Sequence, residues 1–200
     1  MTEDSVVRDP ITNVIYGEHG IKRSVRILLD SGCYLGALTI LFSTLDAMGN
    51  LDRPANNEKG TKRDFLTWAD RYIRLEAAVR SDVVELVGTS RITSVELYAA
   101  RCAVLHTYGS ESDISRAGNA RQIGWMVSSE TNVPCKPAAV CKPTAGKELV
   151  MVDINHFSNV VLDAVDRFIR DALTDESRKE ILGIRLRNLL CALPFLPNSS

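Results

Sequence analysis

The spacing of hydrophobic side chains predicts a mainly helical protein. Apolar residues recur every three or four positions in four long segments, residues 21–51, 63–78, 93–109 and 155–193. This is the period of an α-helix that buries one face. Ser31 and Gly32 are a candidate break that would divide the first segment into two helices. Aromatic side chains in the second segment fall at helical spacing, so we interpret them as core packing rather than as a platform for stacked bases. We expect five or six helices.

Two short segments predict β-structure instead. Ile123–Val127 and Glu148–Ile154 are short apolar runs near turn residues, which is typical of strands. We expect them to pair as a small two-stranded ribbon. The chain is then a single domain, residues 1–200, in which residues 123–154 form a β-ribbon insertion.

The helix predicted between Thr93 and Gly109 is the most informative segment. Thr93 and Glu96 have the spacing of a capping box, and Gly109 is expected to supply the left-handed residue that ends the helix. Most residues between them are apolar, so we expect burial on all sides, within a domain or in a subunit interface. Arg101 lies in an apolar stripe, where a charge needs a partner or a ligand. Asp46 is a candidate partner; a solvated aspartate at a helix edge is the alternative.

Within this helix, Arg101, His106 and Tyr108 follow the pattern R-x4-H-x-Y. The pattern resembles the signature of HEPN-domain proteins, which include small α-helical ribonuclease toxins paired with nucleotidyltransferase antitoxins. The segment Y-L-G-A-L-T-I-L-F-S-T-L-D-A is similar to the first core helix of these proteins. The resemblance covers about residues 21–110 and implies a HEPN-like helical bundle. The alternative is that Arg101 is an interface arginine and that His106 interacts with the negative end of the helix dipole.

The resemblance implies a metal-independent endoribonuclease, the toxin of a toxin–antitoxin or defence system, with Arg101 and His106 as catalytic residues. RNA cleavage through the ribose 2′-hydroxyl needs a base, which a histidine supplies, and a cation for the phosphate, which an arginine supplies. A five-residue offset places the two residues about 7.5 Å apart along a straight helix, on divergent faces. The resemblance implies a homodimer in which both motifs line one cleft.

Four further residues complete the candidate site. The resemblance implies that Tyr108 accepts adenylate from a nucleotidyltransferase antitoxin, which would inactivate the enzyme. Cys102 stands where active HEPN ribonucleases usually carry a polar residue, often asparagine, and this is a departure from the family pattern. We group it with Tyr108 as a residue that supports the site or is modified. Arg116 and Arg121 are candidate contacts to RNA phosphates, and a solvated connecting loop is the alternative. A catalytically inert HEPN-like dimer that acts as a binding or regulatory module is the rival to the enzyme.

Chemical motifs are few outside this helix. The loop between the predicted strands holds Cys135 and Cys141, with His156 nearby, but two thiols and one imidazole leave a zinc site one ligand short. The sequence has no glycine-rich phosphate loop, nucleophile elbow or H-E-x-x-H motif. We therefore expect no metal and no cofactor.

Composition indicates an ordinary globular protein. Apolar residues make up 45% of the chain and the net charge is -1, which argues against avid nonspecific binding of nucleic acid but leaves a local basic site open. Five cysteines without C-x-x-C spacing suit a reducing compartment. The acidic start M-T-E-D-S is no signal peptide, and the longest apolar run, residues 33–42, is too short to span a membrane. We predict a cytoplasmic protein with no membrane partner.

Overall fold

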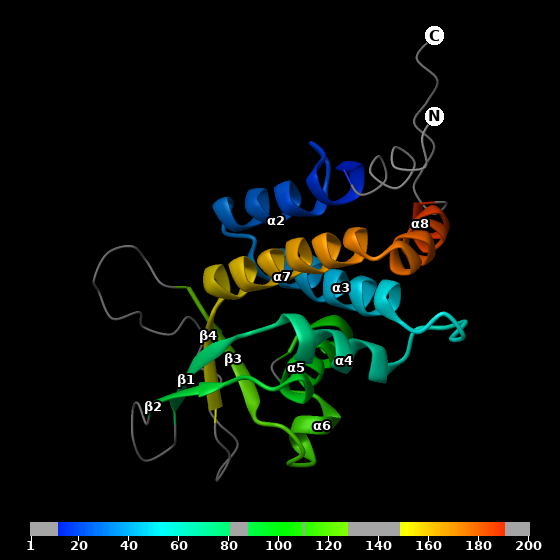
Figure 1. Ribbon diagram of the computed structural model, residues 1–200. Helices are drawn as coiled ribbons and strands as arrows, with labels where there is room; N and C mark the ends of the chain where they lie inside the picture. The colour runs from blue at the N-terminus through cyan, green and yellow to red at the C-terminus, as the bar shows by residue number, and fades with distance from the viewer. Residues whose placement is uncertain (1–11, 81–87, 110, 128–148, 191–200) are drawn as a thin grey trace.

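The computed structural model describes residues 12–80, 88–109, 111–127 and 149–190 (Figure 1). The mainly helical class is confirmed. The described elements are, in chain order, a π-helical turn η1 (Thr12–Tyr16), α2 (Ile21–Asp30), α3 (Tyr34–Asp52), α4 (Lys62–Tyr72), β1 (Glu76–Arg80), β2 (Gly88–Arg91), α5 (Ser94–Thr107), α6 (Asp113–Arg116), β3 (Gln122–Met126), β4 (Leu149–Asp153), α7 (Ile154–Thr174) and α8 (Glu176–Leu190). The described α-helices are one more than the expected five or six, and the additional one is α6, a single turn that has no sequence period of its own.

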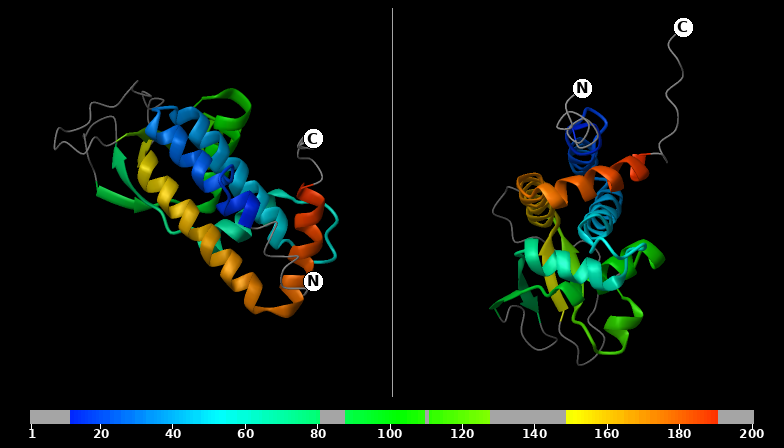
Figure 2. Two further views of the ribbon diagram at one scale, coloured as in Figure 1. Left: turned by 90° about the horizontal axis from the view of Figure 1, so that it is seen from above. Right: turned by 45° about the vertical axis from the view of Figure 1, so that its right-hand side comes forward.

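Helix α3 is the centre of the helical part. It packs against α2, α4, α5, α7 and α8. Figure 2 shows α2, α3 and α7 side by side, with α8 crossing near one end of them. The predicted break before α3 is confirmed: Gly32 has a φ of 70°, a left-handed conformation that glycine adopts without steric cost. Gly49 lets α4 approach closely, since a Cβ there would lie 2.9 Å from the Cα of Phe65.

The sheet has four described strands in the order β2-β1-β4-β3. β1 is antiparallel to both β2 and β4, whereas β3 and β4 are parallel, with Gly124 opposite Met151. Both predicted strand segments are therefore strands. The expected two-stranded ribbon is wrong in size, because β4 also pairs with β1. Residues 122–126 and 149–153 thus share one sheet with residues 76–80 and 88–91.

Strand β1 replaces the end of a predicted helix. Residues 76–80 read E-A-A-V-R, and we expected the 63–78 helix to run through most of them. Alanine and glutamate favour helices. The chain nevertheless leaves α4 at Ile73, which is extended at φ -90° and ψ 129°. Pairing with β2 on one side and β4 on the other satisfies the backbone of β1, and this non-local pairing outweighs a weak local propensity.

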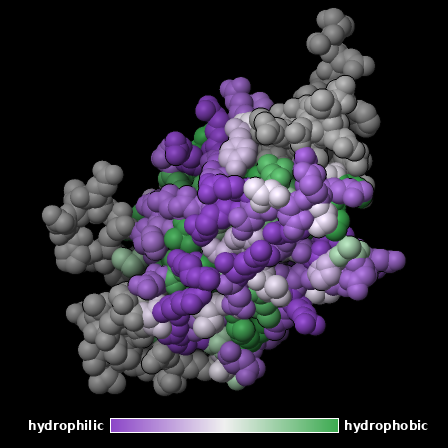
Figure 3. Space-filling model, viewed as in Figure 1, coloured by the Kyte–Doolittle hydropathy of each residue, from purple (hydrophilic) through white to green (hydrophobic). Residues whose placement is uncertain are grey.

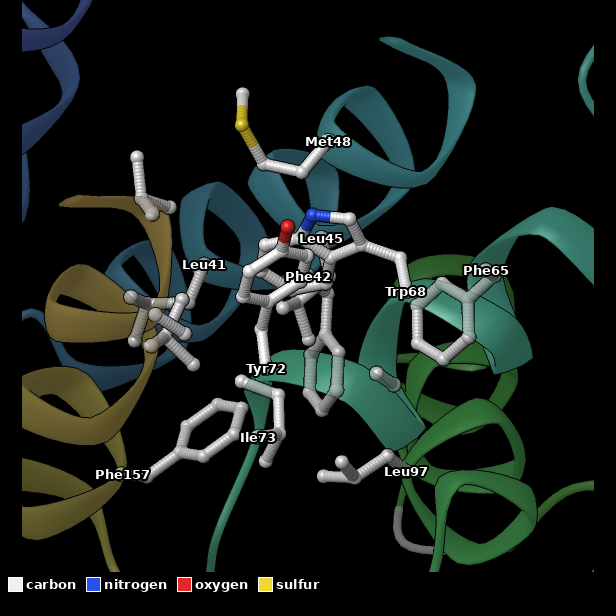
Figure 4. Close-up of a cluster of buried hydrophobic side chains, with 14 of the residues drawn as sticks. Leu41, Phe42, Leu45, Met48, Phe65, Trp68, Tyr72, Ile73, Leu97 and Phe157 are labelled. Atoms are coloured by element: carbon white, nitrogen blue, oxygen red, sulfur yellow. The ribbon is translucent and has the colours of Figure 1, made fainter. Parts of the chain in front are cut away.

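The core lies between the helices and the sheet. Trp68, Phe42, Phe157 and Phe168 are almost completely buried, and Figure 4 shows Trp68 with Phe42, Leu45 and Tyr72 in the middle of one cluster. The aromatic residues of α4 are therefore core residues, as predicted. By contrast, the face of the molecule in Figure 3 is mostly hydrophilic, with hydrophobic side chains exposed in small separate areas.

Candidate functional site

Arg101 is held by an acidic partner from the central helix. From α5, its Nε and Nη2 atoms donate to Oδ2 of Asp46 on α3, at 2.8 and 2.6 Å. Of the two alternatives for Asp46, pairing with Arg101 or solvation at a helix edge, the structure shows the pairing. Burial alone would lower the pKa of Arg101, but the hydrogen bonds and charge of Asp46 outweigh it and hold this pKa above its ordinary value. The guanidinium is therefore charged at any physiological pH, with its orientation fixed.

His106 contacts the same guanidinium within one chain. Nη1 of Arg101 lies 3.0 Å from Nε2 of His106. The expectation of divergent faces was drawn from the helix axis alone, and it is wrong for the side-chain ends because the long arginine side chain spans the offset. Arginine only donates hydrogen bonds, so Nε2 must accept in this contact, with any ring proton on Nδ1. His106 is exposed to solvent, unlike the half-buried Arg101.

Beside Arg101 the surface is hollowed into a cavity of about 500 Å³. Its lining comes from α3, α5, the first part of α4 and the loop before it, and consists of Asp46, Ala47, Asn50, Gly60, Thr61, Lys62, Phe65, Tyr98 and Arg101. Nζ of Lys62 lies 5.0 Å from the centre of the Tyr98 ring, and Cζ of Arg101 lies 5.9 Å from it. Two cations therefore stand against one aromatic ring at the cavity wall.

Sequence reasoning missed Tyr98 and Lys62 as members of this site. Tyr98 precedes Arg101 by three residues, a spacing that places side chains together on one helix face and could have identified it. No such local signal exists for Lys62, because it lies in another helix and is brought there by the packing of α4 against α5. Phe65 fixes Tyr98 from the core side, with ring centres 5.3 Å apart in an edge-to-face arrangement.

Cys102 lies close to the same group of side chains. Its thiol is half-buried and is not in a disulfide. Burial first, and the neighbouring Cys102 second, raise the pKa of Tyr98. Contact with Cys102 also adds to the raised pKa of Arg101. Cys102 therefore touches the cavity wall without lining the cavity.

Tyr108 ends α5 in an unusual backbone conformation. Its φ of 50° and ψ of 27° are left-handed, and it is the one non-glycine residue with positive φ among the described residues. The expectation that Gly109 takes this position is wrong by one residue. A left-handed conformation costs a residue with a side chain about 1–2 kcal/mol. The side chain is 70% exposed, so its hydroxyl is accessible from solvent.

Arg121, one of the two predicted phosphate contacts, lies at the opposite end of α5 from His106. Arg121 donates to both carboxylate oxygens of Glu96, at 2.5 and 3.1 Å, and to Ser90. Glu96 is in the first turn of α5, about 15 Å along the helix from His106. Arg121 therefore fixes the start of α5 and is not beside the catalytic candidates, which corrects the prediction. Arg116 is exposed and pairs with Asp113 in the same turn of helix.

Comparisons with protein-family models, with curated proteins and with solved structures find no match to this chain. Among the described residues, no three histidine, cysteine, aspartate or glutamate side chains are grouped so that they could hold a metal ion. The cysteines of the 128–148 loop lie outside the described residues. None of the described helices is both long and apolar enough to cross a membrane.

Proposed function

We propose that this chain is a metal-independent endoribonuclease of the HEPN type. The observation that carries the proposal is the 3.0 Å contact between Arg101 and His106, which puts a fixed cation and an imidazole at one point near a helix end. The residues of the R-x4-H pattern thus meet in space as well as in sequence. Asp46 supports this role because it orients the guanidinium and leaves Nη1 directed at His106.

The proposed reaction uses the ribose 2′-hydroxyl as the nucleophile. Nε2 of His106 takes the hydroxyl proton while the 2′-oxygen attacks phosphorus, and the bond to the 5′-oxygen breaks. The products are a 2′,3′-cyclic phosphate and a 5′-hydroxyl, whose proton comes from solvent or from His106 of the partner subunit. Arg101 moves its Nη1 donor from Nε2 of His106 to a phosphate oxygen, which stabilises the developing charge and leaves Nε2 able to accept the proton.

The cavity suits the nucleotide next to the cleaved bond. Lys62 provides a second cation for a flanking phosphate, and Tyr98 with Phe65 provides aromatic surface. Asn50 and Thr61 add groups that can hydrogen-bond a base or ribose. This arrangement takes a single strand better than a duplex, since one splayed nucleotide must enter the hollow.

Two partners belong to the proposal. The first is a second copy of the chain, across the open stripe of α5 that carries the half-buried residues Tyr98, Cys102 and Leu105. The buried face of α5, which includes Leu97, Ala100 and Val104, already packs within one chain, so an interface would use the partly exposed residues beside it. The second is a nucleotidyltransferase antitoxin, for which the exposed Tyr108 hydroxyl is an accessible acceptor of adenylate. The free thiols of Cys33 and Cys102 suit a reducing cytoplasm.

The experiment is cleavage of an unstructured, end-labelled RNA by purified protein in excess EDTA. Wild type should cleave it, whereas His106→Ala and Arg101→Ala should lose about 10²–10⁴-fold in rate. His156→Ala is the matched control, because His156 is also exposed and lies in a different helix, so its rate should equal that of wild type. Equal rates for wild type and His106→Ala would refute the assignment.

One observation favours the alternative of a binding or regulatory module. Arg101 is already paired with the carboxylate of Asp46, at 2.8 and 2.6 Å, as a structural arginine is. If wild-type protein binds the RNA but leaves it as intact as the same RNA incubated without protein, the binding or regulatory module is the better description.

A further inference from the structure

A second hollow, about 580 Å³, lies on the other side of the loop that joins α3 to α4. We call it the arginine groove, after the five arginines that line it: Arg53, Arg63, Arg71, Arg178 and Arg185. They come from the loop, from α4 and from α8. Figure 1 shows this loop and α8 at the same end of the molecule. The groove is separate from the Arg101 cavity and has no part in the proposed chemistry.

The groove carries a local positive charge in a chain whose net charge is -1. Its acidic lining residues are Asp52 and Asp64, so the five arginines leave a formal charge of +3. Both carboxylates are engaged. Asp52 accepts from Arg178 at 2.6 Å, and Asp64 accepts from the backbone and hydroxyl of Thr61 at the start of α4.

Two of the arginines are fixed without being neutralised. Arg185 donates to the carbonyl oxygens of Leu51 and Pro54, at 2.8 and 2.9 Å. Arg53 donates to the carbonyl oxygen of Asn57 at 2.9 Å. Burial first, and the charge of Arg53 second, lower the pKa of Arg185, as expected where positive charges gather. Carbonyl groups hold these side chains in place while their charges still face the groove.

The wall formed by α4 presents two further arginines in a row. Arg63, Thr67 and Arg71 are spaced by four residues, so they share one helix face, and all three are exposed. The two arginines are about 12 Å apart along the axis. Arg63 makes no hydrogen bond or ion pair with the described residues, and Arg71 lies over the Tyr72 ring at 5.3 Å. A row of this length matches an extended polyanion better than a single small anion.

We propose that the arginine groove binds the phosphate backbone of the RNA strand that is cleaved at Arg101 and His106. The two hollows adjoin: Nη1 of Arg53 donates to Oδ1 of Asn50 at 2.7 Å, and Asn50 lines the Arg101 cavity. Lys62 lines that cavity and the next residue, Arg63, lines the groove. A strand that crosses the first turn of α4 therefore meets cations on both sides. The identity of the strand as RNA rests on the proposed function.

The test measures binding, which does not depend on cleavage. Fluorescence anisotropy of a labelled single-stranded RNA is recorded with His106→Ala protein, with and without Arg63→Glu and Arg71→Glu together. This double reversal should raise Kd by tenfold or more and should make the salt slope less negative by about 1.4, the value for two lost contacts to a single strand. The matched control reverses Arg23 and Arg26, which are exposed on α2 and change net charge equally. Its Kd should change less than threefold.

A second variant tests the same surface with a single substitution, in case the double reversal disturbs the fold. Thr67→Glu places one negative charge between the two arginines at an exposed position, and it should weaken binding in the same direction with an unchanged circular dichroism spectrum. Equal losses in the groove and control variants, or no loss in either, would overturn the proposal. Tripolyphosphate is titrated as a separate probe. If it binds the groove while RNA does not, the assignment to a strand is wrong.

The assays also separate this proposal from the proposed function. Groove-dependent binding of RNA that wild type never cleaves would refute the ribonuclease and retain the groove. Cleavage that depends on His106, together with RNA binding unaffected by the groove variants, would refute the groove and retain the ribonuclease.

Discussion

Replacing Asp46 by asparagine tests whether the candidate site is organised as the geometry indicates. The substitution keeps the size of the side chain and removes its charge. Arg101 then keeps a hydrogen-bond acceptor but loses the carboxylate that now accepts two of its donors, at 2.6 and 2.8 Å. The guanidinium is left with a charge that only solvent and a weaker acceptor can compensate.

The exposure of the Arg101 and Asp46 side chains determines how much free energy of unfolding the substitution should cost. Exposed ion pairs contribute about 0.2–1 kcal/mol to stability, whereas breaking a fully buried pair costs about 3–5 kcal/mol. Side-chain exposures of 21% for Arg101 and 32% for Asp46 put this pair between those cases. We therefore expect Asp46→Asn to lower the free energy of unfolding by about 1–2 kcal/mol, since a hydrogen bond to a charged group contributes about 1.5–3 kcal/mol and part of it survives.

The assay is urea unfolding at neutral pH, followed by circular dichroism, together with the RNA cleavage rate. Asp163→Asn on α7 is the control, because this exposed carboxylate has no ion pair among the described residues. A double-mutant cycle with Arg101→Ala should show that most of the effect of Asp46→Asn disappears when the arginine is absent. A change of less than about 0.3 kcal/mol in stability, within the scatter of surface substitutions, would refute the argument that this pair fixes the site.

Three further predictions concern stability. Burial alone would raise the pKa of Glu96, but the hydrogen bonds and charge of Arg121 and the hydrogen bonds with Thr93 outweigh it and hold this pKa below its ordinary value of 4.5. Glu96 therefore stabilises the fold above pH 4.5, and this contribution is lost as pH falls through the lowered pKa. Urea unfolding should show a steeper acid loss for wild type than for Glu96→Gln, and parallel curves would contradict this. Tyr108→Gly should raise thermal stability by about 1 kcal/mol by relieving the left-handed backbone, and destabilisation would show that the tyrosine side chain makes contacts that outweigh the strain. Gly49→Ala should lower it by more than about 1 kcal/mol, because the added Cβ would meet the Phe65 backbone at 2.9 Å; an unchanged melting temperature would mean that α4 moves freely.

The fold could be predicted wherever one residue period extends over several turns. Helices α3 and α7 carry apolar stripes of that kind, and Gly32 marks the break before α3 in the sequence itself. Strand β1 could not be predicted, because its five residues have no strand pattern of their own. Its conformation is decided by pairing with β4, which lies about seventy residues later in the chain.

The candidate site divides in the same way. Asp46 and Arg101 each stand on an apolar helix face, so the sequence makes them candidate partners, but it leaves a solvated Asp46 open as well. The contact between Arg101 and His106 could not be predicted from the sequence, because it depends on how far the flexible arginine side chain extends beyond the helix backbone. The predicted position of Arg121 was wrong for a related reason. The sequence of the polar segment after α5 does not indicate that Arg121 contacts Glu96 at the start of that helix rather than the end that carries His106.

Helix α3 carries two carboxylates that each hold an arginine from a different helix. Asp46 orients Arg101 of α5, and Asp52, six residues later, orients Arg178 of α8. Six residues of helix measure about 9 Å, and this length is insensitive to motions of the loop that separates the two hollows. Helix α3 therefore sets a fixed spacing between the Arg101 cavity and the arginine groove. For the proposed RNA, an oligonucleotide long enough to reach both places gains the affinity of two linked sites, whereas a shorter one has only one of them. Chain length would then be selected by the protein before any base is read.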